Sequence, residues 1–523
     1  MEEEQAASLS FKYGLPYVDL SGFPISLEAL GMLPKAQSED SQTIVFFKDG
    51  ADLRLGTANP ANALVAKIRD ELIARHFKVQ TYFISAASLR AAQELYAKVS
   101  VPREQTSDTI QVHGSSNYNQ SLKKLEGDGP VLNATEILET LLGAGAQLKA
   151  SDIHIEPEEH FIKIRLRLDG VLSDVGHMSK QYQKAVISRI KILSKLKLNV
   201  EDRPQDGRFS YVLGGKPTDV RVSVLPSAYG EGVVMRLLSN AATNLKFDEL
   251  GLTGRSYEIL KNELQKPNGM IITTGPTGSG KTTTLYAFMN LLNEPGVKII
   301  TLEDPIEYKL EGVIQTPVNP ALTFAGGLRA ILRQDPDVIM IGEIRDAETA
   351  ETALQAALTG HVVLSTLHTN DAAGAIPRLI NMGIKPFVIA PALNAIIAQR
   401  LVRRLCPDCK QEVKPDPFML ERVQKILREI PKNSGVEAPK EFKFYHSVGC
   451  TACNGTGYRG RIGIYEVIAK NDRLDQLIMA GAASSEIKKA VIEDGMITMM
   501  QDGLLKALQG ITDIEEVFRV TQE

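Results

Sequence analysis

Gly275-Pro-Thr-Gly-Ser-Gly-Lys-Thr282 is the stretch that decides the fold of this 523-residue chain. It matches the pattern G-x-x-x-x-G-K-[ST] at every fixed position. The preceding Met270–Thr274 is a short apolar run rich in β-branched residues, which predicts a buried strand. Leu285–Leu292 carries apolar residues at helical spacing, so a helix is predicted to follow. Strand, loop and helix in this order are the context that a phosphate-binding loop requires.

The chemistry of this loop follows from its residue types. Glycines let the backbone turn its N–H groups inward around phosphate oxygens, and the helix N-terminus adds positive potential there. We expect Lys281 to reach the β- and γ-phosphates of ATP and the Thr282 hydroxyl to hold Mg²⁺. Eight matching positions disfavour the alternative of a glycine-rich turn that binds nothing. The predicted nucleotide-binding residues are Gly275, Pro276, Thr277, Gly278, Ser279, Gly280, Lys281, Thr282 and Thr283.

Acidic residues follow the next predicted strands. Val297–Leu302 leads into Glu303-Asp304, Asp337–Ile341 leads into Gly342-Glu343, and a third strand ends at His368. Strands that alternate with helices imply a parallel sheet, whose ligands bind at the carboxyl ends of the strands. Mg²⁺, the attacking water and the γ-phosphate must meet at that edge. The predicted catalytic residues here are Glu303, Glu343 and His368, with Glu343 also near the magnesium ion.

The chain is too long for one hydrophobic core, so several domains are expected. The predicted class is α/β throughout, with a parallel sheet in the nucleotide domain. Predicted strands include residues 43–47, 79–83 and 161–168, and predicted helices include 61–76, 86–97 and 131–146. The predicted parts are an α/β domain at 1–100, a linker at 101–129, a second α+β domain at 130–240, the nucleotide domain at 241–400, a tetracysteine subdomain at 401–465 and a helical segment at 466–523.

The second domain is rich in arginine. Phe161–Leu168 alternates apolar and basic residues, and Asp169-Gly170 predicts a hairpin turn. Arg165 and Arg167 are therefore predicted to share one face of a sheet. Two interpretations stay open: a solvated basic face, or arginines that reach a phosphate on another subunit.

The four cysteines form two pairs, Cys406-x2-Cys409 and Cys450-x2-Cys453. Pairs with this spacing predict a four-thiolate Zn²⁺ site, which is closed and therefore structural. The spacer of 40 residues, 410–449, is longer than in compact zinc ribbons. The alternative is four buried free thiols, which the pairing of every cysteine disfavours.

Charge and hydropathy exclude several classes. The net charge of −4 gives no electrostatic support for nucleic-acid binding, so no nucleic-acid partner is expected. The acidic start, Met1-Glu-Glu-Glu, argues against a secretory signal, and no run of about 18 apolar residues predicts a spanning helix. We therefore expect a cytoplasmic protein that a membrane-bound partner recruits.

Read in order, these motifs resemble the GspE/PilB-type secretion and pilus-assembly ATPase family over almost the whole chain. Ala150–Pro157 matches the second N-terminal domain of that family. The segments that resemble its aspartate box, its Walker B region, its histidine box and the lead into its zinc motif are Thr301–Glu307, Leu332–Asp346, Thr359–Asp371 and Gln399–Cys406.

The resemblance implies a homo-hexameric ring of RecA-like subunits with a PAS-like second domain and a GspE-type first domain. ATP is expected between the nucleotide domain of one subunit and the second domain of another, where Arg165, Arg208 and Arg221 occupy arginine positions expected to contact phosphate. Hydrolysis is expected to move an inner-membrane platform protein, together with cytoplasmic assembly proteins, so that pilin-like subunits enter a fibre. The enzyme is then peripheral to the membrane.

Departures and alternatives bound this interpretation. Arg54–Asn59 carries only part of the pattern with which some relatives bind cyclic di-GMP, so that function is not carried over. Retraction motors lack the first domain and the cysteines, and having both favours assembly. A small-molecule kinase, a nucleic-acid translocase and a nucleotide-gated scaffold remain alternatives, and phosphate release without an acceptor distinguishes hydrolysis from transfer.

Overall fold

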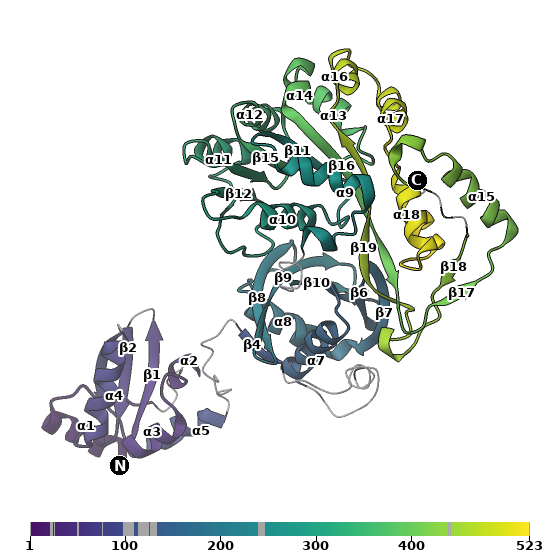
Figure 1. Ribbon diagram of the computed structural model, residues 1–523. Helices are drawn as coiled ribbons and strands as arrows, with labels where there is room; N and C mark the ends of the chain where they lie inside the picture. The colour runs from purple at the N-terminus through teal and green to yellow at the C-terminus, as the bar shows by residue number, and fades with distance from the viewer. Residues whose placement is uncertain are drawn as a thin grey trace. The chain divides into compact units, whose positions relative to one another are not determined.

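Figure 1 shows the computed structural model of the chain. It describes residues 2–20, 27–49, 52–75, 77–97, 109–112, 133–238, 246–437 and 441–521, together with the single residues 23, 25, 125 and 439. The chain divides into two compact units, Met1–Ser107 and Asp108–Glu523. No helix among the described residues has the length and apolar character needed to cross a bilayer.

The first unit is a small α/β domain. Its three-stranded sheet has the order β1-β2-β3, with β1 antiparallel and β3 parallel to β2. The predicted strands and helices of this region are present, and β2 is an addition in which Leu53 and Leu55 alternate into the core. The elements are α1 Glu2–Tyr13, α2 Leu27–Leu30, α3 Lys35–Ser41, β1 Thr43–Asp49, β2 Asp52–Thr57, α4 Ala63–Ala74, β3 Lys78–Phe83, α5 Ala86–Glu94 and a 3₁₀ turn at Leu95–Ala97.

The second unit begins with a seven-stranded sheet of order β4-β8-β9-β10-β5-β6-β7. Helices α7 and α8 pack in one core with the apolar side chains of this sheet. Strand β4, in which Ile110 and Val112 are buried, lies inside the segment 101–129 that we predicted as a linker. The elements are β4 Thr109–Val112, α7 Ala134–Gln147, β5 Asp152–Pro157, β6 Phe161–Leu168, β7 Val171–Ser179, a 3₁₀ turn at Lys180–Tyr182, α8 Gln183–Leu193, β8 Gln205–Leu213, β9 Lys216–Ser227 and β10 Gly230–Leu238.

A row of charged residues crosses the opposite face of this sheet. In the register of the strands, Arg208 lies opposite Arg221, Arg221 opposite Arg236, Arg236 opposite Asp152, and Asp152 opposite Arg167. The buried Asp152 carboxylate binds Arg236 at 2.9 Å and Arg167 at 3.3 Å. The predicted shared face is therefore confirmed, and it continues over four further strands.

The nucleotide domain is built on a second seven-stranded sheet of order β13-β12-β14-β15-β11-β16-β19. All its pairs are parallel except β16 with β19, so the predicted α/β class with a parallel sheet is confirmed. Helices α9 and α10 pack on one face and α11 to α14 on the other. The elements are a 3₁₀ turn at Phe247–Glu249, α9 Gly254–Leu264, β11 Gly269–Thr274, α10 Lys281–Leu292, β12 Ile299–Glu303, β13 Val313–Pro317, α11 Phe324–Ile331, β14 Val338–Ile341, α12 Ala347–Leu358, β15 Val362–Leu367, α13 Ala375–Asn381 and α14 Pro386–Ala392.

Two long strands join the nucleotide domain to the cysteine region. β16 and β19 pair as one antiparallel ribbon, and they cross the positions 400 and 465 that we predicted as subdomain boundaries. Short strands and helices continue beyond the ribbon (Figure 1). The elements are β16 Leu393–Leu405, β17 Gln411–Val413, α15 Pro417–Arg428, 3₁₀ turns at Lys432–Ser434 and Thr451–Cys453, β18 Phe444–His446, β19 Tyr458–Ala469, α16 Asp472–Met479, α17 Ser484–Glu493, α18 Met499–Leu508 and α19 Ile514–Thr521.

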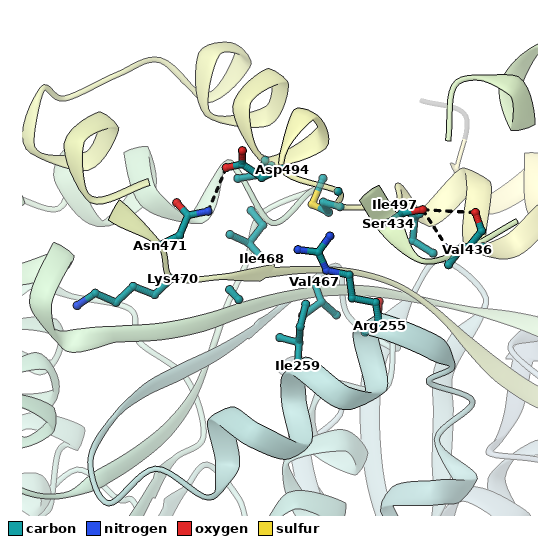
Figure 2. A pocket seen from close by; sticks show the side chains of 15 residues that line it. Arg255, Ile259, Ser434, Val436, Val467, Ile468, Lys470, Asn471, Asp494 and Ile497 are labelled. Carbon is teal, nitrogen blue, oxygen red and sulfur yellow. Dashed lines mark hydrogen bonds between the residues drawn. The ribbon is translucent and has the colours of Figure 1, made fainter. Parts of the chain in front are cut away.

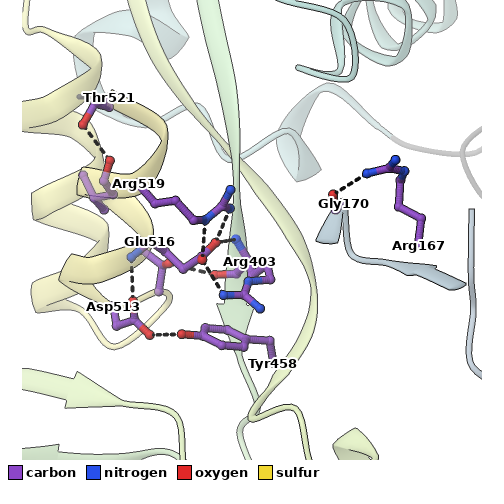
Figure 3. A network of polar contacts seen from close by, with 10 residues as sticks. Arg167, Gly170, Arg403, Tyr458, Asp513, Glu516, Arg519 and Thr521 are labelled. Carbon is purple, nitrogen blue, oxygen red and sulfur yellow. Dashed lines mark hydrogen bonds and ion pairs between the residues drawn. The ribbon is translucent and has the colours of Figure 1, made fainter. Parts of the chain in front are cut away.

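A buried ion-pair network fastens the last helix to this ribbon (Figure 3). Glu516 of α19 accepts from the guanidinium of Arg403 at 2.5 Å and from Arg519 at 2.7 Å. The Arg403 guanidinium also lies 3.8 Å from the centre of the Tyr458 ring, whose hydroxyl donates to Asp513. Burial alone would raise the pKa of Glu516, but the hydrogen bonds from Arg519 and Arg403 outweigh it and lower that pKa to about 2.

Glu516→Gln should destabilise the fold by about 3 kcal/mol near neutral pH, because it leaves two arginines around a neutral group. The folded pKa lies below the ordinary 4.5, so the stability that the carboxylate contributes is complete above about pH 4.5 and is lost as pH falls toward 2. Thermal melting across this range should show the gap between variant and parent narrowing with acid. Glu515→Gln on the exposed side of the same helix is the control, and equal effects of both variants would contradict the network's role.

Candidate functional site

The phosphate loop connects a buried strand to a helix, as the sequence predicts. All six residues of β11 are buried, and α10 begins at Lys281. Gly275, Gly278 and Gly280 have φ values of 143°, 80° and 90°, which residues with a side chain rarely adopt. These glycines therefore shape the cradle that a phosphate group would fill.

Lys281 lies across this loop. Its ammonium donates to the carbonyl oxygens of Gly275 at 2.8 Å and Pro276 at 3.1 Å. Burial lowers the pKa of Lys281, and the nearby Glu343 carboxylate acts in the opposite direction. Thr282, the predicted magnesium ligand, is half-buried in the first turn of α10. The residues present fit a nucleoside triphosphate with Mg²⁺. The metal ion would supply positive charge that stabilises the phosphate group during its transfer.

Glu343 lies at the centre of a charged cluster after β14. Its carboxylate is 3.4 Å from the His368 ring nitrogen and pairs with Arg345, which also lies 3.7 Å from Asp304. The structure thus brings together Glu343, His368 and Asp304 from the ends of three strands. Arg345 was not predicted, although its position two residues after Glu343 in the sequence is a signal that could have indicated it. The hydrogen bond to Glu343 raises the pKa of Arg345.

Glu303 has a different environment. It is buried, and its carboxylate accepts from Thr301 at 2.6 Å, from Gln315 at 3.0 Å and from the hydroxyl of Tyr286 on α10. Burial, together with the Glu303 charge, raises the pKa of Tyr286. The predicted pair of catalytic acids is therefore divided between a half-exposed cluster and a buried network. Sequence reasoning missed Tyr286 and Gln315, because contacts between separate elements leave no local pattern.

The three predicted arginines of the second domain have different partners. Arg221 binds the Glu307 carboxylate at 3.1 Å and the Ile306 carbonyl at 2.7 Å within the same chain. Arg165 pairs with Glu156 at 2.5 Å, whereas Arg208 is exposed. Arg208 is therefore the member of the set with the most accessible side chain for a contact outside its own chain.

The four cysteines form one cluster. All four Sγ atoms lie within 4.8 Å of one another, with separations of 3.9 Å for Cys406–Cys450, 3.8 Å for Cys409–Cys453 and 3.7 Å for Cys450–Cys453. A tetrahedron with Zn–S bonds of about 2.3 Å has edges of about 3.8 Å, so the cluster is compatible with zinc.

The β16–β19 ribbon explains the long spacer between the two cysteine pairs. Leu405 at the end of β16 lies opposite Tyr458 at the start of β19, so the ribbon brings the two pairs together from opposite directions. The 40 intervening residues form β17, α15 and β18 as an insertion beside the cluster.

A separate cavity of about 160 Å³ lies between α9, the end of β19 and the loops around residues 434–436 and 494–497 (Figure 2). Its lining combines apolar side chains such as Ile259 and Val467 with polar ones such as Arg255 and Asn471. Among the described residues that line it, none belongs to the predicted nucleotide or metal sites. This cavity is therefore separate from the predicted nucleotide site, which consists of the phosphate loop and the neighbouring strand ends.

Comparison with known proteins places this geometry in a family. Residues 125–519 match the family model described as type II/IV secretion system protein. The chain belongs to this family. It is 47% identical over 407 residues to the type II secretion system ATPase E of Vibrio cholerae serotype O1, covering 77% of this chain and 78% of that protein. It is 39% identical over 520 residues to the type IV pilus assembly ATPase PilB of Myxococcus xanthus, covering 97% and 89%.

A solved structure supports the fold alone. The Legionella pneumophila ATPase DotB superposes with a TM-score of 0.55 at 21% identity, covering 76% of this chain and 98% of that one. Together with the phosphate loop, the family match makes this member an ATP hydrolase that uses ATP with Mg²⁺. The predicted family, enzyme class and RecA-like fold are thus confirmed.

Glu343→Gln should separate nucleotide binding from turnover. The amide keeps the shape but removes the charge beside Lys281, so ATP should bind while the single-turnover rate falls at least about 100-fold. Glu303→Gln should instead lower the melting temperature, because an amide group meets the donors of Tyr286 and Gln315 in a buried site. ATP affinity, single-turnover rate and thermal melting of both variants make this test. A Glu343→Gln enzyme that hydrolyses at the parental rate would show that the catalytic assignment is wrong.

Proposed function

We propose that this chain is a hexameric motor ATPase that powers assembly of a type II secretion pseudopilus or a type IV pilus. The observation that carries the proposal is a phosphate loop beside the Glu343–Arg345–His368 cluster, in a chain similar along 97% of its length to a pilus assembly ATPase. The relatives named for type II secretion support the pseudopilus as the other product. The motor acts on an inner-membrane platform protein and is recruited to the membrane by its partners.

In this proposal each part of the loop has a stated task. The backbone N–H groups between Gly275 and Lys281 would hold the phosphates, Lys281 would neutralise the charge of the β- and γ-oxygens, and Thr282 would hold Mg²⁺. Glu343 would order the attacking water, directly or through the Mg²⁺ ligands, and the His368 ring lies 3.4 Å from the same carboxylate. Glu303 of β12 accepts a hydrogen bond from Tyr286 of α10 and so holds these two elements together. Its buried charge contributes to polarising the attacking water.

A short chain of contacts supports coupling between hydrolysis and domain motion. Glu343 pairs with Arg345, Arg345 lies beside Asp304, and three residues later Glu307 binds Arg221 of the second domain. In this proposal, a change of charge or position at Glu343 is transmitted to Arg221 of the second domain through one segment, residues 304–307. Coupling of this kind requires that residues 304–307 can adopt two arrangements. Their ion pairs are partly exposed and therefore individually weak, so they can be exchanged at low cost.

In the proposed ring, the arginine-bearing second domain of one subunit lies at the nucleotide of its neighbour. Exposed Arg208 is the residue we assign to the neighbouring subunit's phosphate, with Arg165 and Arg221 in supporting positions on the same domain. The cysteine cluster, at the end of the β16–β19 ribbon, would hold one structural Zn²⁺. A closed four-thiolate site offers no position for substrate, so zinc stabilises and does not catalyse.

Arg208→Ala should lower ATPase activity by about 10³-fold or more, because an arginine supplied to the transition state from outside the core has effects of that size. Mixing Arg208→Ala chains with Lys281→Ala chains should recover part of the activity, since some sites then combine an intact loop with an intact arginine. Phosphate release is the readout.

Arg203→Ala, an exposed arginine of the same domain that lies off the charged row, is the matched control and should keep its activity. Lys281→Ala alone should abolish hydrolysis. Rings shown to contain both variants but lacking any recovery would contradict the shared site.

The purified protein should contain one Zn²⁺ per chain, and Cys406→Ser should lose it. Because metal binding contributes directly to folding of such sites, the variant should become sensitive to proteolysis within residues 401–465 while ATP binding persists. Metal analysis and limited proteolysis measure this.

His446→Gln changes an exposed histidine four residues before Cys450 in the sequence and should leave the zinc in place. Four freely titratable thiols in the parent protein, with much less than one equivalent of metal, would refute the zinc proposal.

A further inference from the structure

A buried amide lies directly beneath the phosphate loop. Gln399 of β16 is only 1% exposed, and its side-chain N–H donates to the carbonyl oxygen of Ser279 at 2.8 Å. The sequence pattern assigned Gln399 no task beyond its position before the cysteine region. A long polar side chain in the core of a sheet is retained at a cost, so its single described hydrogen bond deserves an explanation from function.

The loop packs against Gln399 at both ends. A side-chain carbon built on Gly275 would lie 2.6 Å from the Gln399 carbonyl oxygen, and one built on Gly280 would lie 3.1 Å from the Gln399 amide nitrogen. Two of the three positive-φ glycines of the loop therefore also serve close approach to this one residue. The loop cannot change its path without moving relative to Gln399.

The direction of the hydrogen bond determines what it does. In a trans peptide the carbonyl of one residue and the N–H of the next point in opposite directions. With the Ser279 carbonyl held toward the sheet by Gln399, the N–H of Gly280 must point away from the sheet, toward the space where phosphate binds. We propose that Gln399 is a positioning residue that presets the Ser279–Gly280 peptide for the β-phosphate of the nucleotide.

The strand beneath gives this amide a rigid base. β16 pairs on one side with β11, where Ala398 lies opposite Thr274, and on the other with β19, where Gln399 lies opposite Tyr465. Four residues further on, the backbone N–H and guanidinium of Arg403 are both bound by buried Glu516. Gln399 is therefore held on a strand that is paired along both edges, which gives the rigidity that positioning a loop requires.

The test is Gln399→Met, which keeps the length of the side chain but removes the donor. The melting temperature without nucleotide should change by only a few degrees, because the variant leaves the Ser279 carbonyl unpaired but also removes the Gln399 Oε1 atom, which is buried without a partner among the described residues. The affinity for ADP and ATP, measured by competition with a fluorescent ADP analogue, should fall about tenfold. Affinity for AMP, which has no β-phosphate, should not change.

Asn394→Leu is the matched control. Asn394 lies on the same strand and its amide makes the same kind of bond, to the carbonyl of Asn268 at 2.9 Å, but at the entrance to β11 and not under the loop. It should keep its ADP affinity within about twofold. Equal weakening by both variants would reduce the role of Gln399 to general strand packing and overturn the proposal.

Gln399→Asn guards against a folding defect in the first variant, since it keeps the amide but withdraws it by one methylene. ADP affinity should fall here too, and parental ADP affinity in a folded Gln399→Met or Gln399→Asn protein would overturn the proposal. The inference rests on the phosphate loop as the nucleotide site, which Lys281→Ala tests separately. Parental ADP affinity in Lys281→Ala would reject that site, whereas loss there with parental affinity in the Gln399 variants rejects only the role of Gln399.

Discussion

Strand β16 imposes the constraint on which the catalytic unit depends. It is hydrogen-bonded along both edges, to β11 in parallel and to β19 in antiparallel register. A shift of one residue would turn every side chain of such a strand to the opposite face of the sheet, so its register is strongly specified. This strand carries Gln399 under the phosphate loop and Arg403, which the last helix binds, and the first residue of the cysteine cluster follows it directly. The positions of these residues are therefore set together.

Two glutamates at adjacent strand ends have different surroundings. Glu343 is partly exposed, contacts Arg345 and His368, and interacts electrostatically with Lys281. Glu303 is enclosed by three donors and contributes to the packing of β12 against α10. We propose the role at water and metal for Glu343, because three donors already occupy the carboxylate oxygens of Glu303. The segment after Glu303 then connects the two, through Asp304 to Arg345 and through Glu307 to Arg221.

Much of the candidate site follows from local pattern. The phosphate loop, the hairpin at Asp169-Gly170 and the pairing of the cysteines are each written in a few consecutive residues, and the structure has them where they were expected. The ribbon of β16 and β19 was not predicted, because the polar residues Asn394, Gln399 and Arg400 interrupt the apolar pattern of the segment that forms β16. The two amide side chains are tolerated because each finds a backbone carbonyl of a neighbouring segment. The assignments of catalytic and trans-acting residues stay predictions, since contacts between subunits lie outside a single chain.

Residue order alone was enough for the fold class, the family and the chemistry of phosphate binding, because these depend on backbone geometry and spacing within short segments. Which side chains contact one another was decided only by the tertiary structure. That Tyr286 and Gln315 enclose Glu303 and that Gln399 supports Ser279 are contacts between residues 12 to 120 positions apart. Such pairs form only after the sheet has set its strand order and register, and no local periodicity encodes which strand becomes whose neighbour.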